Sequence, residues 1–560
     1  MTRRLFTGVA AARGVAVGRS YRTDRDHAES LPRRAIGDPV QQITDAFDAV
    51  QQRMKRLADS LRLQGQREQA EIMDVAGYLA ADADLRGAAL SHARDGEPVT
   101  VAIMRAVESY AGMLAALVDP ILAERATDVR QIGRRALAWL HGDTDDEQDG
   151  PLVLLAHEIG AADLLEPHAP VVAAVSVTGG PNSHAAIVAR SLGIPLLLGV
   201  DESTLDCPDG TEVLVDGVRA RVIRQPDTHE REAALIAIEA ARAHRTSLVA
   251  GRDLPSQTRD GHPITLRANV ATPADAAAGL QAGSDGVGLL RTELPFLDAQ
   301  AWPGYHQHLA ALTPIFRRLT GYPVTVRTLD FADDKLPPFL APGSDGHLGR
   351  GLPLMLARPA AFAEQFRAIL TAGAATDLRI MIPMVADADE LHACRELLAT
   401  AADRTGVPAP PIGAMIELPE AVADIERIAA AADFLSIGSN DLTCQILGLD
   451  RRDPTATPAM TAHPAVLQAI RTVVTTAHDH GRLVSVCGDA AAHAQVIPLL
   501  IGLDCDILSV APAALDTVRA DVRGLNRTTC TAIAHSALAC HDVEQVRQLL
   551  NHSTTTAEPA

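Results

Sequence analysis

The sequence has few aromatic residues, few cysteines, no long apolar run and too few basic residues to balance its acidic ones. Only 3% of its 560 residues are aromatic, and the formal net charge is −20. Its seven cysteines are odd in number, scattered and free of CxxC spacing. That pattern argues against a disulfide framework or a zinc site and is typical of reduced thiols. The excess of negative charge argues against a nucleic-acid-binding protein.

Signals for membranes and export are also missing. No uncharged apolar run is long enough to span a bilayer, and the first residues, MTRRLFTG, lack the apolar core of a signal peptide. We therefore expect a cytoplasmic protein without membrane association. Nearly half of the residues, 47%, are hydrophobic, so Ala, Leu and Val can fill large cores. The length favours roughly two to four domains.

The most informative stretch is residues 179–195, which reads GGPNSHAAIVARSLGIP. Ser183 is a favourable N-cap residue and Gly193 a favourable helix end, so we expect a short helix over residues 185–192. His184 then lies in the first turn, where free N–H groups and the positive end of the helix dipole favour a phosphate. A neutral imidazole there can attack phosphorus and carry the phosphoryl group. A single histidine without this context is more often a surface or core residue.

The first half of the chain predicts an α/β domain that is interrupted by helices. Apolar or alternating runs predict strands near residues 5–22, 152–155, 171–177, 196–199 and 213–216. Residues 40–140 instead repeat their apolar positions at helical spacing. We therefore expect three parts: an α/β domain from residues 1–32 and 147–225, an inserted helical domain over 33–146, and a connecting helix and linker over 226–254.

The second half repeats one pattern eight times, a short apolar run followed by a helical segment. The runs are Ile264–Val270, Gly286–Arg291, Val324–Asp330, Leu378–Val385, Ile412–Leu418, Asp433–Asp441, Leu483–Asp489 and Ile507–Pro512. Eight strand–helix units are what a (β/α)8 barrel requires, and we place that barrel at residues 255–550. The Thr-rich end, residues 551–560, is expected to be a disordered tail.

Polar residues gather at the ends of these runs, which form the catalytic face in such barrels. They are Asn269, Arg291, Arg327, Glu417, Asn440, Asp441, Cys487 and Asp489, with Arg451 further along the chain. Arginines bind phosphate through paired hydrogen bonds, and two carboxylates with room for water suit Mg²⁺. Each residue alone has a structural explanation, as a rim ion pair, a solvated strand end or a buried thiol. Together they favour a small phosphorylated substrate that also carries a carboxylate.

Residues 179–195 resemble the phosphohistidine segment of Enzyme I of the bacterial sugar phosphotransferase system, GG-x-TSH-x-x-I-x-AR-x-x-x-x-P, with Asn182 in place of the usual Thr. Pyruvate phosphate dikinase and phosphoenolpyruvate synthase carry a related segment. Five barrel stretches are also similar to Enzyme I motifs: GVGLLRTELPF, VRTLDFADDK, GAMIELPEA, FLSIGSNDLTCQILGLDR and SVCGDAA. In the helical domain, residues 123–133 (AERATDVRQIG) resemble an Enzyme I signature.

The resemblance implies an enzyme that moves the phosphoryl group of phosphoenolpyruvate to its own histidine and then to a histidine of the carrier protein HPr, releasing pyruvate. It makes His184 the phosphorylated residue, Cys487 the proton donor to the enolate, and Glu417 and Asp441 the ligands of Mg²⁺. It assigns substrate binding to Arg291, Arg327, Lys335, Asn440, Asp441 and Arg451. It also implies that the helical domain docks HPr, that the phosphohistidine domain moves on the connecting helix, and that the barrel forms a homodimer.

Three places depart from the family pattern. Ala332 and Asp333 replace two glycines before the motif lysine, which restricts the backbone and adds negative charge near a phosphate. The arginine expected at position 351 is Gly351, with Arg350 one position earlier. A Thr that contacts the active histidine in the family has no counterpart in residues 158–161, EIGA.

Two other functions stay open at this point. A dikinase or synthase would need an ATP-grasp domain, for which the helical residues 40–140 leave no room. The second is a catalytically weakened paralogue that acts as a regulatory or binding protein. The intact His184, Cys487, Glu417 and Asp441 argue against it, and release of pyruvate would separate it from the enzyme.

Overall fold

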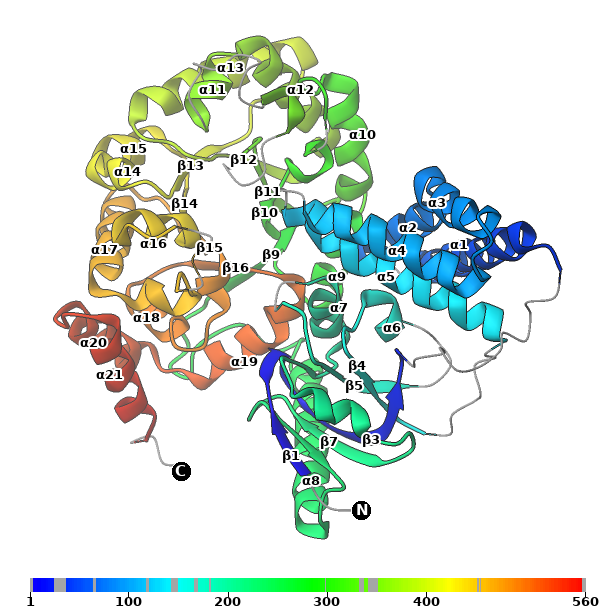
Figure 1. The fold of residues 1–560 in the computed structure, drawn as a ribbon. Coiled ribbons are helices and arrows are strands. Elements are labelled where there is room, and N and C mark those ends of the chain that lie inside the picture. The colour runs from blue at the N-terminus through cyan, green and yellow to red at the C-terminus, as the bar shows by residue number, and fades with distance from the viewer. Residues whose placement is uncertain are drawn as a thin grey trace. The chain divides into compact units, whose positions relative to one another are not determined.

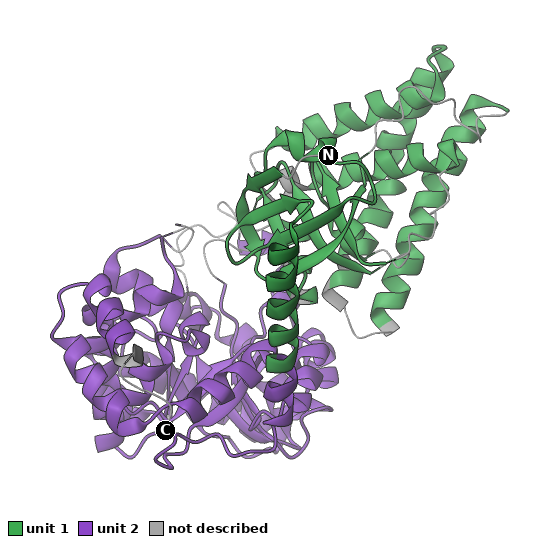
Figure 2. Cartoon of the chain, turned by 90° about the horizontal axis from the view of Figure 1, so that it is seen from below, with its two compact units in different colours: residues 1–244 green, residues 245–560 purple. Residues whose placement is uncertain are grey.

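The computed structural model describes residues 4–24, 37–63, 67–116, 120–142, 150–165, 170–180, 183–297, 299–331, 337–340, 351–450, 453 and 455–555. The chain divides into two compact units, residues 1–244 and 245–560, which Figure 2 colours green and purple. Each unit has its own hydrophobic core. The mixed α/β class predicted from the sequence is confirmed.

The helical part of the first unit consists of α1 (Pro39–Leu63), α2 (Arg67–Ala80), α3 (Ala83–Arg94), α4 (Val99–Ala115) and α5 (Pro120–His141). These helices, blue to cyan in Figure 1, confirm the helical spacing over residues 40–140. Ile103 and Val107 of α4 and Val129 and Ile132 of α5 are all buried. They recur at three- and four-residue intervals, which places them on one face of each helix.

The α/β part of the first unit is an eight-stranded sheet in the order β1-β8-β7-β3-β4-β5-β6-β2. Its strands are β1 (Arg4–Thr7), β2 (Val9–Ala12), β3 (Val15–Arg22), β4 (Leu152–Ala156), β5 (Val171–Ser176), β6 (Leu196–Leu198), β7 (Glu212–Asp216) and β8 (Arg221–Arg224). Strands β3 to β6 are parallel, and the flanking pairs are antiparallel. The sequence did not predict β8, because arginines occupy both ends of its four residues.

Strand β4 shows how the sheet joins the helical part of its unit. Leu152 and Leu154 belong to the core that the helices α1 to α5 share, whereas Val153 and Leu155 belong to a cluster on the opposite face. This alternation is the two-residue period of a strand that is buried on both sides. Helices α6 (Ala161–Leu165) and α7 (His184–Leu192) contribute to the helical side. The helix that carries His184 therefore packs in the core shared with the helical part.

Helix α8 (Thr228–Ala250) lies within residues 226–254, for which the sequence predicted a connecting helix and linker. The boundary between the two compact units falls inside this helix, after His244. The finer domain boundaries proposed from the sequence stay predictions.

The second unit is a closed barrel of eight strands that are all parallel, which confirms the predicted (β/α)8 architecture. The strands are β9 (Thr265–Val270), β10 (Val287–Leu290), β11 (Pro323–Arg327), β12 (Asp377–Ile382), β13 (Ile412–Ile416), β14 (Leu435–Gly438), β15 (Val484–Cys487) and β16 (Ile507–Val510). Around them in Figure 1 lie α9 (Pro273–Gln281), α10 (Tyr305–Phe316), α11 (Leu352–Leu356), α12 (Pro359–Gly373), α13 (Ala388–Thr405), α14 (Pro419–Ala423), α15 (Ile425–Ala431), α16 (Ser439–Leu447), α17 (Pro464–Asp479), α18 (Ile497–Gly502), α19 (Leu515–Gly524), α20 (Arg527–Leu538) and α21 (Val543–Thr555).

Two expectations about the second unit need correction. The run Asp433–Asp441 is not one strand, because β14 ends at Gly438 and helix α16 begins at Ser439. The predicted disordered tail is helical over residues 551–555, since α21 continues to Thr555. Residues 556–560 lie outside the described residues.

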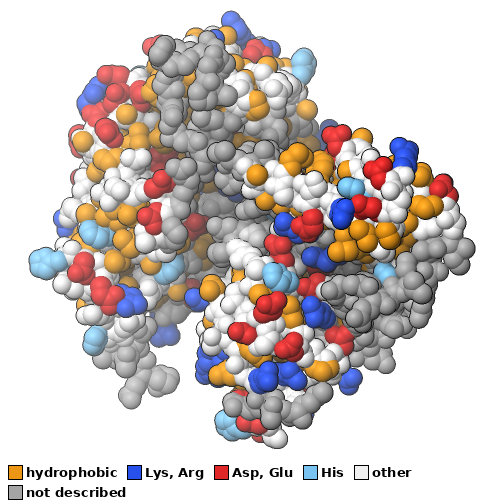
Figure 3. Space-filling model, viewed as in Figure 1, with side chains coloured by type: hydrophobic (Ala, Val, Ile, Leu, Met, Phe, Trp, Pro, Cys, Tyr) orange, Lys and Arg blue, Asp and Glu red, His pale blue; other side chains and the backbone are white. Residues whose placement is uncertain are grey.

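The surface carries charges of both signs. On the face drawn in Figure 3, Lys and Arg side chains lie among Asp and Glu side chains rather than forming one basic patch. In the part of the chain that the structure describes, no helix is both long enough and apolar enough to cross a bilayer.

Candidate functional sites in the two units

His184 is the first residue of α7, in the helix turn that the sequence predicted. Ser183 is the N-cap, and its Oγ accepts a hydrogen bond from the backbone N–H of Ala186 at 3.3 Å. Gly193 ends the helix with a φ of 65°, a left-handed conformation that glycine adopts at little cost. The imidazole side chain is 21% exposed. This position at the positive end of a helix favours an anionic phosphoryl group beside the ring.

A carboxylate from the helical part faces this histidine. Asp128 of α5 places its Oδ2 3.8 Å from Nδ1 of His184, and its side chain is only 11% exposed. Arg125 pairs with the same oxygen at 3.1 Å. Burial raises the pKa of Asp128, His184 and Arg125 act to lower it, and Glu158 raises it further. Asp128 is therefore a buried acid whose ionised form is stabilised by Arg125 and by His184.

The loop that follows β4 packs against the same helix. Thr127 donates a hydrogen bond to Oε1 of Glu158 at 2.6 Å, and Arg135 pairs with Asp163 at 2.6 Å. Residues 158–161 are where the sequence predicted the loss of a Thr next to His184. In this chain that segment contacts α5, the helix that carries the AERATDVRQIG signature.

In the barrel, Glu417 follows β13 directly and is 1% exposed. Its Oε1 accepts a hydrogen bond from the backbone N–H of Met384 at 2.7 Å. Met384 has a φ of 54°, which non-glycine residues adopt rarely and mostly at functional sites. Burial raises the pKa of Glu417 to about 8, Asp330 and Asp441 raise it as well, and Arg327 opposes them.

The charges around Glu417 fit a divalent cation. The carboxyl groups of Glu417, Asp330 and Asp441 interact electrostatically, and Arg327 is the guanidinium that offsets them. With Glu293, which also pairs with Arg327, four carboxyl groups lie around one guanidinium. Burial and this imbalance raise the pKa of Glu417, and a cation with oxygen ligands would favour its ionised form. Among the described residues, no group of three or more His, Cys, Asp or Glu side chains could hold a metal ion by itself. A site at Glu417 would need water and substrate oxygens as further ligands, which magnesium commonly accepts.

Arg327, at the end of β11, is 9% exposed and pairs with two carboxylates, whereas its buried Nε has no hydrogen-bond partner among the described residues. One of its nitrogens lies 2.8 Å from Oε1 of Glu293, and another lies 2.8 Å from Oδ2 of Asp330. Burial acts to lower the pKa of Arg327, but Glu293, Asp330 and Glu417 outweigh it and raise it. The guanidinium is a permanent positive charge held at a strand end by two carboxylates.

Cys487 is the last residue of β15 and is 3% exposed. Its Sγ donates to the carbonyl of Ile437 at 3.5 Å and accepts from Oγ of Ser436 at 3.8 Å. Burial raises the pKa of Cys487 to about 11, and the nearby Glu417 raises it as well. The thiol consequently stays protonated at neutral pH, which suits an acid and excludes a thiolate nucleophile.

Asn440 and Asp489 are linked across two neighbouring strand ends. Nδ2 of Asn440 donates to Oδ2 of Asp489 at 3.3 Å, and the backbone N–H of Asp489 donates to Oδ1 of Asn440 at 3.1 Å. Gly488 between the strand and Asp489 has a φ of 95°, and a Cβ there would lie 2.8 Å from Oδ1 of Asn440. The glycine is required because the turn brings the backbone against that amide.

Arg291 lies directly after β10, and its side chain is exposed. Its backbone N–H donates to the carbonyl of Val270 at 2.9 Å. Within the described part of the chain, no ion-pair partner of its guanidinium is recorded. The rim ion pair that the sequence left open is therefore not formed with those residues, and the cation is available for an anion.

Other predicted residues fall outside the described ranges. They are Lys335 and Arg451 of the predicted site, and Ala332, Asp333 and Arg350 of the departures. Gly351 is described and has a φ of 63°, and a Cβ on it would lie 3.1 Å from Cβ of Met384. A larger residue would be strained there, so position 351 supplies no cation in this chain.

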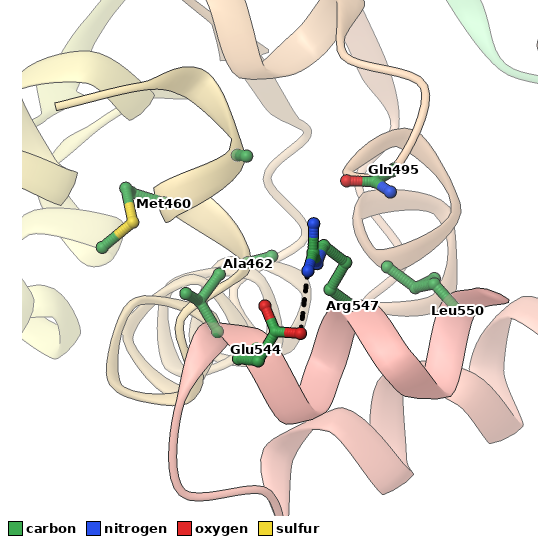
Figure 4. A pocket seen from close by; sticks show the side chains of 8 residues that line it. Met460, Ala462, Gln495, Glu544, Arg547 and Leu550 are labelled. Carbon is green, nitrogen blue, oxygen red and sulfur yellow. Dashed lines mark hydrogen bonds and ion pairs between the residues drawn. The ribbon is translucent and has the colours of Figure 1, made fainter. Parts of the chain in front are cut away.

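A separate pocket in the second unit involves none of these residues. It is lined by Ala459, Met460, Ala462, Gln495, Val543, Glu544, Arg547 and Leu550. In Figure 4, Glu544 and Arg547 of α21 form an ion pair, with a separation of 2.8 Å. Because the two charges neutralise each other and the remaining lining is mostly apolar, the candidate chemistry stays at the strand ends.

Sequence reasoning missed three carboxylates. Glu293 stands two residues after Arg291, Asp330 stands three residues after Arg327, and Asp128 lies inside the AERATDVRQIG signature. Each lies within a motif that was recognised, so the local signal was present. The pairings of Glu293 with Arg327 and of Asp128 with His184 were not predictable, since each joins elements that are far apart in the sequence.

Comparison with known proteins places the chain in a family. Residues 246–527 match the family described as PEP-utilising enzyme, PEP-binding domain, residues 7–125 its N-terminal domain, and residues 149–220 its mobile domain. A multiphosphoryl transfer protein of Xanthomonas campestris pv. campestris is 35% identical over 556 residues, covering 97% of this chain and 66% of that protein. One of Rhodobacter capsulatus is 36% identical over 454 residues, covering 80% of this chain and 55% of that protein. A phosphoenolpyruvate-protein phosphotransferase of Latilactobacillus sakei is 29% identical over 568 residues, covering 97% and 98%.

The chain thus spans less than two thirds of the two multiphosphoryl transfer proteins and nearly all of the length of the L. sakei protein. The three matched regions follow one another in the order that the sequence motifs predicted. The match to the PEP-binding domain alone extends over about half of the chain and includes all eight barrel strands. The chain belongs to the family of PEP-utilising enzymes.

Proposed function

We propose that this protein is a phosphoenolpyruvate–protein phosphotransferase. It transfers the phosphoryl group of phosphoenolpyruvate to His184 and then to a histidine of an HPr-like carrier protein, releasing pyruvate. The observation that carries the proposal is the cluster at the barrel strand ends, where the buried Glu417 lies close to Arg327 and the protonated Cys487. The name of the L. sakei relative, which this chain matches over nearly its whole length, supports the same activity.

The substrate carries a phosphate and a carboxylate, and the strand ends offer cations for both. The exposed Arg291 binds one anionic group, and Arg327 binds the other once the substrate competes with its carboxylate partners. The sequence motifs add the cations Lys335 and Arg451 and the neutral amide of Asn440. Transfer of a phosphoryl group depends mainly on such positioning and charge neutralisation.

The cation is Mg²⁺ in this proposal, held by Glu417 and Asp441. When bound, Mg²⁺ neutralises charge on the phosphate oxygens and orients them for displacement. The excess of carboxylates around Glu417 supports a divalent ion at this position. The N–H of Met384 fixes one oxygen of Glu417, so the other oxygen is left to point at the ligand.

Cleavage of the phosphate ester leaves an enolate, which becomes pyruvate when its carbon receives a proton. Cys487 supplies that proton, because its pKa of about 11 keeps the thiol protonated and available. The hydroxyl of Ser436 donates a hydrogen bond to Sγ of Cys487 at 3.8 Å and can assist the reprotonation of the thiol. The thiol recovers its proton before the next turnover.

The helical part docks the carrier protein in this proposal, and the barrel forms a homodimer, both as the family resemblance implies. All seven cysteines are free, which supports a cytoplasmic location with reduced thiols. The connecting helix α8 lets His184 serve the barrel and the carrier in turn.

The test is the release of pyruvate in the presence of phosphoenolpyruvate, Mg²⁺ and a purified HPr. Sustained release is expected with the carrier and about one equivalent without it, because His184 is then filled once. His184→Ala is expected to abolish both, and His229→Ala, an exposed histidine of α8, is expected to leave both unchanged. Release that does not depend on His184 would contradict the proposal.

A further inference from the structure

The nearest charged neighbour of His184 comes from a different part of its unit. Oδ2 of Asp128 lies 3.8 Å from Nδ1 of His184, with the two side chains 11% and 21% exposed. No partner of the other ring nitrogen, Nε2, is recorded among the described residues. The two nitrogens of the ring therefore differ: one faces a buried carboxylate and the other is left open.

The position of Asp128 is fixed by the docking of α5 on the loop after β4. Thr127 precedes Asp128 and donates a hydrogen bond to Glu158. Arg135 lies two helical turns further along α5 and forms an ion pair with Asp163 of α6. A Cβ on Gly160 would overlap a side chain of α5, so the contact is close. The packing of α5 on the loop after β4 consequently fixes the position of the Asp128 carboxylate.

The charged groups around Asp128 come from all three neighbouring elements. They are Arg125 on its own helix, His184 on α7 and Glu158 on the loop after β4. A guanidinium nitrogen of Arg125 lies 3.1 Å from Oδ2 of Asp128, the oxygen that also faces His184. Glu158 is negative and opposes ionisation of Asp128, whereas Arg125 favours it. The arginine therefore stabilises the ionised form of the carboxylate that faces Nδ1 of His184.

We propose that Asp128 is a positioning residue for His184, holding the ring proton on Nδ1 so that the lone pair of Nε2 faces the phosphoryl donor. The inference rests on the proposed function for its role in catalysis. A carboxylate at Nδ1 selects the tautomer and orients the ring. The separation of 3.8 Å is an ion-pair distance, and hydrogen bonds of this kind commonly shorten in the reacting complex.

During phosphoryl transfer the ring of His184 gains positive charge, and a carboxylate at Nδ1 stabilises that charge. The lone pair of Nε2 forms the new N–P bond while the P–O bond of phosphoenolpyruvate breaks, and its electron pair leaves on the enolate oxygen. The Nδ1 proton remains on the ring, which acquires a positive charge as the bond forms. Asp128 stabilises that charge. On transfer to the carrier the N–P bond breaks, its electrons return to Nε2, and the ring is neutral again.

The test compares Asp128→Asn with Asp163→Asn. Asp163 is a matched control, because it is 12% exposed, belongs to the same interface and pairs with Arg135 rather than with His184. The first measurement is the ¹⁵N chemical shifts of the His184 ring in the unphosphorylated protein at pH 8, assigned by their absence in His184→Gln. We expect the Nδ1–H tautomer in the wild type and in Asp163→Asn, and a shift toward Nε2–H in Asp128→Asn.

The second measurement is the rate of phosphohistidine formation from phosphoenolpyruvate. Asp128→Asn is expected to lower it by roughly 10- to 100-fold, the range seen when the outer partner of a ligating histidine is removed. Asp163→Asn is expected to stay within about twofold, and Asp128→Glu to recover part of the loss. An unchanged tautomer in Asp128→Asn would overturn the inference. If the wild type forms no phosphohistidine, the proposed function fails, while the tautomer measurement still decides the role of Asp128.

Discussion

Replacing Glu417 by Gln should stabilise the barrel more and more as the pH rises. Glu417 is 1% exposed, and its burial next to Asp330 and Asp441 raises its pKa to about 8 from 4.5. A group with a raised folded-state pKa contributes stability that is complete below the unfolded value and is lost as the pH rises through the folded one. The wild type, without metal, should therefore weaken steadily between pH 5 and pH 8.

Gln is a suitable probe because it keeps the shape of the side chain and removes only the charge. Its carbonyl can still accept the N–H of Met384, which lies 2.7 Å from Oε1 of Glu417. Each pH unit between the two pKa values is worth about 1.4 kcal/mol. From pH 6 to pH 8 the advantage of Glu417→Gln should grow by about 2–3 kcal/mol, roughly 5 °C in the melting temperature.

The assay is thermal unfolding in a chelating buffer from pH 6 to pH 9, above the sequence pI of about 5.4. Glu420→Gln, an exposed carboxylate three residues away, is the control and should show no pH-dependent advantage. Mg²⁺ should then stabilise the wild type and leave Glu417→Gln unchanged, because the variant lacks a charged ligand. A difference between Glu417→Gln and the wild type that stays constant from pH 6 to pH 9 would refute the reasoning.

Two further predictions concern the strand ends. Burial next to Glu417 raises the pKa of Cys487 to about 11. Iodoacetamide at pH 8 should therefore leave Cys487 unlabelled in the native protein and label the half-buried Cys444 and Cys540. Cys487→Ala should reduce pyruvate release at least 100-fold and change phosphoenolpyruvate binding little. A Cβ on Gly438 would lie 2.7 Å from Oε2 of Glu417. Gly438→Ala should therefore lower the free energy of unfolding in urea by about 1–3 kcal/mol and remove the stabilisation by Mg²⁺. Full retention of that stabilisation would show that the glycine is not needed.

The barrel could be predicted because its strands are short buried runs in a regular series. A strand that is buried on both faces reads as a continuous apolar segment, and Ile412–Ile416 and Val484–Cys487 are buried at every position. The boundaries were less certain. Asn440 and Asp441 were placed on a strand, but they lie in the first turn of α16, which begins directly after β14 ends at Gly438.

Residues of the candidate site could be predicted where the side chain itself suggests a chemical role. They could not be predicted where the role depends on a partner from a distant part of the sequence. Glu417 and Cys487 stood out as polar residues at the ends of apolar runs. The pairing of Arg327 with Glu293 joins residues that are 34 positions apart, and no local pattern encodes it. Asp128 reaches His184 only because α5 packs on the loop after β4, a tertiary contact that spacing cannot show.

The central claim is that phosphoenolpyruvate phosphorylates His184 and that pyruvate is released. The most direct measurement incubates the protein with ³²P-labelled phosphoenolpyruvate and Mg²⁺, counts pyruvate and acid-labile protein phosphate, and locates the phosphate by mass spectrometry. We expect about one phosphate per chain on His184, equal to the pyruvate released, and none in His184→Ala. Binding of phosphoenolpyruvate without pyruvate or phosphohistidine would contradict the claim and indicate a protein that retains the site without its chemistry.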